Sequence, residues 1–308
     1  YKKAEKKLFS IKKKLTHPIK LKTKEKKNNI IKEKVNSNIS RTEYIRTVKK
    51  IKKYITSGDV IQLVPSIRFN RKFLQSPFSL YRSLRKLNPS PFLFILNFNN
   101  FSIVGSSPEI LIRLKENQIT LRPIAGTRKR GKNENEDKRL SQDLLNDPKE
   151  IAEHLMLLDL GRNDVGKVSK INTVKVTERF KVEKYSHVMH IISNVEGKFN
   201  QKQSLLDTML AGFPAGTVSG APKIRAMEII AELEPDKRGP YSGAVGYFDF
   251  TGNMDTAITI RTLVVKDGVA YTQAGGGIVY DSKPDLEYEE TIHKASAVLR
   301  AIEQAEAR

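Results

Sequence analysis

The sequence predicts an α+β fold in which large, mostly antiparallel β-sheets are covered by helices on the outside. Strand-like segments come in pairs joined by tight turns, which is typical of antiparallel hairpins. Single amphipathic helices separate these pairs, and the sequence has no strict strand–helix–strand repeat. Both observations favour antiparallel sheets over a parallel, doubly wound sheet.

The individual elements follow from apolar spacing and turn residues. The expected elements of the first half are a helix at 41–58, a strand at 60–69 with a break near Pro65, a helix at 76–88, a hairpin at 91–105, a hairpin at 109–127 and a helix at 147–160. Those of the second half are strand at 172–187, a glycine-rich loop feeding a helix at 208–233, strands joined by tight turns at 243–250 and 253–280, and a final helix at 284–305.

The composition is that of a globular protein with a core. Of the 308 residues, 39% are hydrophobic and 29% are charged. We expect neither a membrane span nor a signal peptide, because the sequence lacks a run of about 18 apolar residues. The absence of cysteine excludes disulfides, zinc–thiolate sites and a cysteine nucleophile.

The net charge of +21 is spread unevenly along the chain. Residues 1–40 hold 14 Lys and 3 Glu, a charge of +11, so residues 41–308 carry +10. We expect 1–40 to be a flexible basic segment and 41–308 to be one catalytic domain. A nucleic-acid-binding arm is one interpretation of the segment. Drift toward Lys in an AT-rich genome is the favoured one, because these lysines are not interleaved with Arg, aromatic residues or glycines.

The glycine-rich stretches do not match nucleotide-binding motifs. The stretch 216–223 lacks the Gly-Lys-Ser/Thr ending of a P-loop. Gly275, Gly276 and Gly277 are expected on a strand, where glycine lets a ligand approach the backbone closely. The sequence also lacks an HExxH metal motif and a Ser/His/Asp order.

Two pairs of glutamates are each spaced by one helical turn. Glu150 and Glu153 lie on an apolar segment, and Glu287 and Glu290 lie on the final helix. A carboxylate on an apolar stripe is costly unless a cation or hydrogen-bond donors satisfy it. Oxygen donors without cysteine favour Mg²⁺. Two unrelated, solvated helix faces remain the alternative that the spacing leaves open.

Long motifs give the chain a specific resemblance over roughly residues 41–308. They are GDVIQLVPSIRF, GSSPEILIRL, RPIAGTRKRG, DPKEIAEHLMLLDLGRND, KYSHVMHIISNVEG, FPAGTVSGAPKIRAMEII and AGGGIVYDSKPDLEYEET. The chain resembles the chorismate-utilising enzymes, and among them anthranilate synthase component I without much of its N-terminal region. The resemblance implies a sandwich of large, mostly antiparallel sheets with outer helices.

The resemblance also implies a metal and a substrate site. Glu153 and Glu290 would bind Mg²⁺ directly and Glu150 and Glu287 through waters, and the metal would hold the ring carboxylate of chorismate. Arg261, expected in a strand, would grip the enolpyruvyl carboxylate; a surface ion pair is its alternative. The further substrate contacts that the resemblance implies are Tyr241, Gly275, Gly276, Gly277, Lys294, Ala125, Gly126 and Thr217.

The implied catalytic residues are Glu109, His190, Gln62 and Thr127. Glu109 matches the general acid that protonates the leaving C4 hydroxyl, a role that needs a raised pKa. His190 matches the histidine needed for loss of the pyruvyl side chain. His187 is the weaker candidate, and a lone histidine is more often structural.

Two positions separate the branches of the family. Relatives that add water carry a lysine base where this chain has Gln62, so ammonia is the expected nucleophile. Relatives that make 4-amino-4-deoxychorismate carry PIKGT with a nucleophilic lysine, where this chain has PIAGT with Ala125. Anthranilate and pyruvate are therefore the expected products, and aminodeoxychorismate synthesis is the runner-up.

The expected partner is a glutamine amidotransferase subunit that supplies ammonia, because that is its source in the family. The resemblance leaves homo-oligomerisation open. We expect a bacterial cytoplasm, with a plastid stroma as the alternative, and we expect neither a membrane nor a nucleic acid as a partner.

Overall fold

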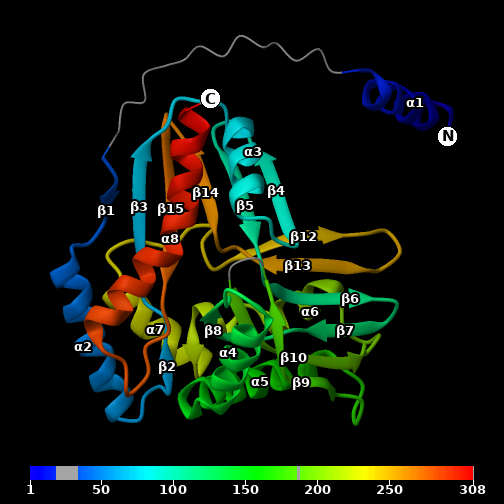
Figure 1. The fold of residues 1–308 in the computed structure, drawn as a ribbon. Helices are drawn as coiled ribbons and strands as arrows, with labels where there is room; N and C mark the ends of the chain where they lie inside the picture. Colours follow the sequence, from blue (N-terminus) through cyan, green and yellow to red (C-terminus); the bar gives the residue numbers. More distant parts are fainter. Residues whose placement is uncertain (19–33, 186–187, 308) are drawn as a thin grey trace.

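Two large antiparallel sheets form the body of the protein (Figure 1), a computed structural model that describes residues 1–18, 34–185 and 188–307. The six-stranded sheet has the order β1 (Asn36–Ser37), β3 (Ser66–Lys72), β15 (Val269–Gly275), β14 (Thr262–Lys266), β5 (Ser102–Ser107) and β4 (Phe92–Asn97). The seven-stranded sheet has the order β12 (Ala244–Phe248), β13 (Met254–Ile258), β6 (Ile110–Lys115), β7 (Gln118–Leu121), β10 (Val188–Lys198) and β8 (Ile124–Lys129), with β9 (Lys175–Lys184) on β10. A short pair joins β2 (Gln62–Leu63) to β11 (Gly220–Ala221).

The chain passes from one sheet to the other at two places that matter for the site. Strand β5 of the six-stranded sheet leads into β6 of the seven-stranded sheet, and β13 leads back into β14 (Figure 1). Glu109 lies in the first of these connections and Arg261 in the second. Because the connections are short, both side chains are held where the two sheets meet.

Helices pack on the outside of the sheets, as the fold class predicts, except that the residues of α1 (Lys2–Thr16) are all exposed. The others are α2 (Arg41–Thr56), α3 (Pro77–Leu87), α4 (Glu134–Asn146), α5 (Pro148–Val168), α6 (Leu205–Gly212), the 3₁₀ turn η1 (Gly216–Val218), α7 (Lys223–Leu233) and α8 (Pro284–Glu306). Local signals set their starts: Ser40 and Glu43 form a capping box on α2, and Asp147 caps α5 ahead of a proline in the first turn.

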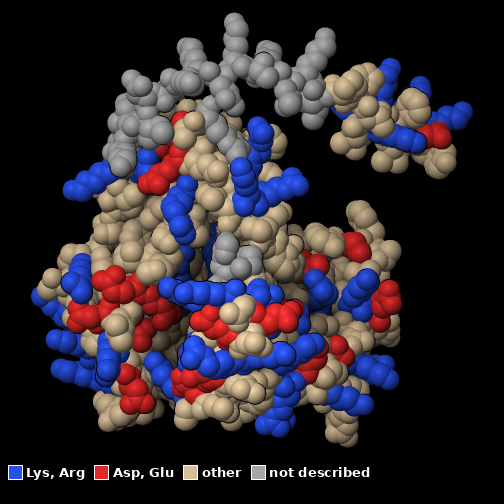
Figure 2. Space-filling model, in the orientation of Figure 1, with Lys and Arg blue, Asp and Glu red and all other residues tan. Residues whose placement is uncertain are grey.

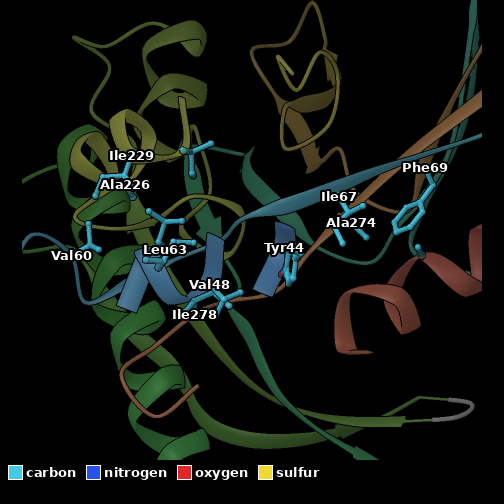
Figure 3. Close-up of a cluster of buried hydrophobic side chains, with 13 residues drawn as sticks. Tyr44, Val48, Val60, Leu63, Ile67, Phe69, Ala226, Ile229, Ala274 and Ile278 are labelled. Carbon is cyan, nitrogen blue, oxygen red and sulfur yellow. The ribbon is translucent and has the colours of Figure 1, made fainter. Parts of the chain in front are cut away.

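Four apolar clusters join the helices to the sheets, and the smallest packs Leu144 of α4 on Met189 and Ile191 of β10. One packs α2 and α7 against β2, β3 and β15 through residues such as Tyr44, Leu63 and Ile229 (Figure 3). A second packs α3 and α8 on the six-stranded sheet, and a third packs α5 on the seven-stranded sheet. The two glutamate-bearing helices, α5 and α8, therefore each pack on a different sheet.

The structure departs from the predicted elements in a few places. Helix α5 continues to Val168, past the predicted end at 160, and the sequence did not predict α4 or α6. Arg261 was expected within a strand; it lies between β13 and β14, at a left-handed φ of 49°. Strand β15 ends at Gly275, so Gly276 and Gly277 lie beyond it.

The basic N-terminal segment is described only in part. Residues 2–16 form α1, and every residue of this helix is exposed. Residues 19–33 lie outside the described residues, so the boundary at residue 40 and the flexibility of the segment stay predictions. Positive and negative side chains both cover the face shown in Figure 2. None of the helices that the structure describes is both long enough and apolar enough to cross a bilayer.

Candidate active site

Glu109 lies next to the end of β13, and Arg261 lies next to the end of β5. The carbonyl of Glu109 accepts from the amide of Ile258 at 3.1 Å, and the carbonyl of Arg261 accepts from the amide of Ser106 at 3.2 Å. The Ser107 hydroxyl donates to the Ile258 carbonyl at 2.6 Å. These hydrogen bonds join the two connections, so the backbones that carry Glu109 and Arg261 are fixed relative to each other.

Glu109 has the properties of a general acid. It is only 8% exposed, and this burial raises the pKa of its carboxyl to about 7 although Thr217, Arg261 and Lys294 favour the ionised form. A cavity of about 30 Å³ is lined by Glu109 and Thr217, together with apolar residues of α5. Near neutral pH a large fraction of Glu109 can therefore give up a proton.

His190 is held as a neutral base. Its Nδ1 lies 2.9 Å from the carbonyl oxygen of Gly126 and 3.1 Å from the hydroxyl of Thr127. Because a carbonyl only accepts, Nδ1 carries the proton and Nε2 keeps a lone pair. Burial lowers the pKa of His190, so the ring is neutral at pH 7. The edge of its ring packs against Tyr185, with 5.5 Å between ring centroids.

A β-bulge between His190 and Ile191 shapes this wall of the site. Thr127 pairs with His190, and Ala125, nearly buried, pairs with Ile191. Gly126 between them has a left-handed φ of 68°, and a side chain there would come within 3.1 Å of Glu150 Oε2. The absence of a side chain at Gly126 thus lets β8 approach the carboxylate of Glu150 closely.

The two glutamate pairs face a common region. Burial, followed by the charge of Glu150, raises the pKa of Glu153 to about 6, and the charge of Glu290 on α8 raises it further. Burial and the charge of Glu290 also raise the pKa of Glu287. Side chains from α5 and α8 therefore repel one another across the site, and the hypothesis of two unrelated helix faces is disfavoured.

Lys294 and the amide of Gln62 moderate the repulsion between the glutamates. Lys294 Nζ lies 2.7 Å from Glu290 and donates to the carbonyl of Gly275 at 3.2 Å. Gln62, only 2% exposed, directs its Nε2 to Glu153 at 3.5 Å.

The glycine strip lies between these groups. A Cβ at Gly276 would stand 3.6 Å from Glu287 Oε2 and 3.8 Å from Glu290 Oε1. A Cβ at Gly277 would clash with the amide of Gln62, and one at Gly275 would clash with the Pro65 carbonyl and lie 3.1 Å from the Tyr241 hydroxyl. A side chain at Gly275 or Gly277 would therefore clash, whereas a Cβ at Gly276 would make only ordinary contacts beside the two glutamates.

The donor chemistry fits Mg²⁺. Within the described residues no group of three or more His, Asp or Glu side chains is close enough to form a complete metal cage. Mg²⁺ does not need one, because it keeps several waters and takes one or two carboxylates plus substrate oxygens. Burial is the first cause of the raised pKa of both Glu153 and Glu287, and a cation bound beside them would favour their ionised forms.

The structure brings most of the predicted residues to this one region, and His187 lies outside the described residues. It also adds residues that the sequence did not single out. Arg128 donates to Glu150 at 3.0 Å and also binds Asp143 and Asp147. Tyr185 packs on His190, and its hydroxyl donates to Glu183 at 2.9 Å. A basic run such as RKRG carries no signal that distinguishes Arg128 from a solvated surface arginine.

Arg261 has no ion-pair partner among the described carboxylates, and burial lowers its pKa. It acts electrostatically on both Glu109 and His190. The alternative of a surface ion pair is therefore disfavoured.

The chain is similar in sequence to known proteins. The chain is 60% identical over 269 residues to anthranilate synthase component 1 of Cereibacter sphaeroides, covering 87% of this chain and 54% of that protein. It is 58% identical over 270 residues to the component 1 of Pseudomonas aeruginosa, covering 88% and 55%. The chain thus spans about half the length of the curated relatives that it matches.

A solved structure matches the fold, and a family model matches most of the sequence. The crystal structure of anthranilate synthase component I from Streptococcus pneumoniae TIGR4 is similar, with a TM-score of 0.87 and 43% identity over 96% of this chain and 65% of that one. Residues 1–300 match the family described as chorismate binding enzyme, so the match begins at residue 1 and not near residue 41 as the motifs suggested. The chain belongs to the family of chorismate binding enzymes.

Proposed function

We propose that this chain carries the chorismate-converting site of an anthranilate synthase. Chorismate and ammonia would give anthranilate, pyruvate and water. Ammonia would come from glutamine through an amidotransferase subunit, in line with the name "component 1" of its relatives. Those relatives are bacterial, and a bacterial cytoplasm stays our expectation for the compartment.

One observation carries the proposal: the same two cations act on an acid, Glu109, and on a base, His190. Arg261 and Lys294 act electrostatically on both Glu109 and His190. The pKa of Glu109 is raised to about 7 and that of His190 is lowered, so one group can donate a proton while the other accepts one near pH 7. The two cations suit the two carboxylates of chorismate.

The first stage uses Glu109. Ammonia attacks ring carbon C2, the ring double bonds shift, and the C4–O bond breaks. Glu109 gives its proton to the departing hydroxyl, which leaves as water, and the proton lost by the new ammonium group balances this transfer. The product is 2-amino-2-deoxyisochorismate.

The second stage uses His190. Its Nε2 takes the proton from C2, and the C3–O bond to the enolpyruvyl group breaks. Pyruvate leaves as its enolate, which takes up one proton, and the ring becomes aromatic. Thr127 and Gly126 hold Nδ1 of the same imidazole and so keep Nε2 as the acceptor.

Two side chains support ammonia over the other nucleophiles of the family. Gln62 has no basic nitrogen that could activate water, and its amide is held by Glu153. Ala125 on β8 has no nucleophilic atom, so a covalent lysine adduct cannot form there. These positions favour anthranilate over 4-amino-4-deoxychorismate.

Mg²⁺ is the metal that we propose for the four glutamates. Glu153 and Glu290 would bind it directly, and Glu150 and Glu287 would bind through waters. When bound, the ion would neutralise and orient the ring carboxylate of chorismate.

The test is an anthranilate fluorescence assay with the purified chain, chorismate, Mg²⁺ and excess ammonium, with product mass spectrometry and an EDTA control. Anthranilate and pyruvate formed only with Mg²⁺ are the expected result. Formation of 4-amino-4-deoxychorismate would overturn the choice of branch. A folded chain that binds chorismate in calorimetry but turns nothing over would show that the site needs the rest of the longer relatives.

A further inference from the structure

Arg238 is a buried cation that the chemistry above leaves unused. It follows α7, and its side chain is 14% exposed. A guanidinium has five N–H groups, and all five are directed at acceptors here. Nε and Nη2 donate to the two oxygens of Glu234 at 2.9 and 2.6 Å, Nη2 donates to the Val64 carbonyl at 2.6 Å, and Nη1 donates to the Val218 carbonyl at 2.6 Å and the Ser242 hydroxyl at 3.3 Å.

Two of these acceptors belong to segments that carry site residues. Val64 lies two residues after Gln62, and Val218 directly follows Thr217. The segments also meet directly, because the amide of Val64 donates to the Ser219 carbonyl at 3.0 Å. Arg238 therefore joins two segments that border the site, which we call walls: the segment of β2 and Val64, which carries Gln62, and η1, which carries Thr217.

A third wall is formed by Tyr241. The guanidinium carbon of Arg238 lies 5.4 Å from the centre of the Tyr241 ring, a distance suited to a cation–π contact. The hydroxyl of Tyr241 lies at the glycine strip, 3.1 Å from where a Cβ of Gly275 would stand. The face of the tyrosine thus rests on the same cation that holds the other two walls.

Glu234 anchors the cation in the six-stranded sheet. Its side chain is 7% exposed, and its Oε1 accepts from the amide and the hydroxyl of Ser66 at 2.9 and 2.7 Å. Ser66 pairs with Gly275 across β3 and β15, and its hydroxyl accepts from Gln273 at 2.7 Å. The ion pair is therefore tied to the strand that ends in the glycine strip.

We infer that Arg238 is a positioning residue that sets the spacing between the walls bearing Gln62, Thr217 and Tyr241. The inference rests on the proposed function, which makes these three residues parts of the substrate site. Arg238 itself does not contact the substrate, since all of its donors are used within the protein. Lysine cannot replace it, because one ammonium group cannot span two carbonyls and a carboxylate in this fork.

The test compares R238K with R71K, the same change at a second buried arginine. Arg71 is 2% exposed and pairs with Glu303 and Glu306 of α8. It lies on the same strand as Ser66, five residues and about 16 Å farther along. We expect both variants to lose thermal stability. R238K alone should lose about 10- to 100-fold in kcat/KM for chorismate, the loss typical of a site displaced by about 1 Å.

Hydrogen exchange gives a readout that does not depend on activity. The amides of Leu63 and Val64 donate to Ile278 and Ser219 at 3.1 and 3.0 Å. Their exchange should be faster in R238K and unchanged in R71K. Unchanged exchange in R238K, or a kcat/KM loss that R71K shares at equal stability, would overturn the inference. A wild-type chain that neither binds nor converts chorismate would count against the proposed function, and the exchange comparison would still decide the role of Arg238.

Discussion

His190 donates a hydrogen bond from Nδ1 to the carbonyl oxygen of Gly126 over 2.9 Å, so Nε2 is the basic atom of the ring. The two residues lie on neighbouring strands, β10 and β8, at a bulge that interrupts their register. The bulge lies where the Gly126 carbonyl meets the imidazole, and this contact selects the tautomer whose Nε2 can accept a proton.

This relationship predicts the behaviour of H190Q. Ammonia addition does not need the imidazole, but removal of the C2 proton does. We expect anthranilate formation to fall by about 10²- to 10⁴-fold, the usual contribution of a general base, while 2-amino-2-deoxyisochorismate accumulates. Mass spectrometry of the products measures both. H293Q, a change at an exposed histidine of α8, is the control; equal anthranilate from H190Q and H293Q would rule out this role.

Glu109 predicts the alkaline limb of the pH profile. The acid must be protonated to act, and with a pKa of about 7 its active fraction falls as pH rises through neutrality. We expect kcat/KM to decline tenfold for each pH unit well above 7. In E109Q the rate should drop by about 10²- to 10⁴-fold and this limb should vanish. A limb that survives the substitution would assign the titration to another group.

The same carboxyl predicts a change in stability. Its folded pKa lies above its ordinary value of 4.5, so its contribution to folding is full below pH 4.5 and is lost as pH rises through about 7. Glutamine has no charge to bury. We therefore expect E109Q to be more stable than wild type at pH 8 and to differ less at pH 5, as measured by urea midpoints. The opposite pH trend would contradict a buried, neutral Glu109.

Local signals in the sequence were enough for much of the fold. The turn at Asn99–Asn100 predicted the β4–β5 hairpin. The turn at Glu116–Asn117 predicted β6–β7, and Glu116 and Asn117 have left-handed φ in the structure. The paired glutamates on α5 and α8 were also visible as one-turn spacings. Each of these features depends on residues that are close together in the chain.

What the sequence could not indicate depends on distant partners. Helix α4 buries only Asp137 and Leu144, so it lacks the apolar stripe that predicts a helix. The loop EPDKRGP gave no sign that Arg238 reaches Val64, 174 residues earlier. Nor could spacing show that the chain changes sheets at Glu109 and Arg261, because that follows from strand pairing across the whole chain.

Metal binding can be tested without turnover. We expect E153Q to weaken Mg²⁺ binding at least about tenfold in calorimetry, because it removes a proposed direct ligand. D159N is the matched control: Asp159 lies on the same helix, its side chain is 58% exposed, and within the described residues it pairs with Arg162 alone. It should leave Mg²⁺ affinity unchanged. Wild-type affinity in E153Q would remove Glu153 from the metal site.

Acid stability should depend on Asp137, a buried carboxylate to which the proposed chemistry assigns no role. Its side chain is 4% exposed and accepts from Arg130 and from the Gly131 amide at 2.7 Å. The Arg130 hydrogen bonds, followed by that of Gly131, hold the pKa of Asp137 at about 2. The folded pKa lies below the ordinary 3.8, so the stabilisation is present above pH 3.8 and is lost as pH falls toward 2.

D137N should therefore lower the urea midpoint at pH 6 and approach wild type as the pH falls below about 3, where the wild-type carboxylate also loses its charge. D143N is the control on the same helix, since its side chain is 61% exposed and an exposed ion pair contributes little. It should shift the midpoint only slightly at either pH. A D137N deficit that stays constant from pH 6 to pH 3 would mean that packing, and not the ionised carboxylate, stabilises this corner of α4.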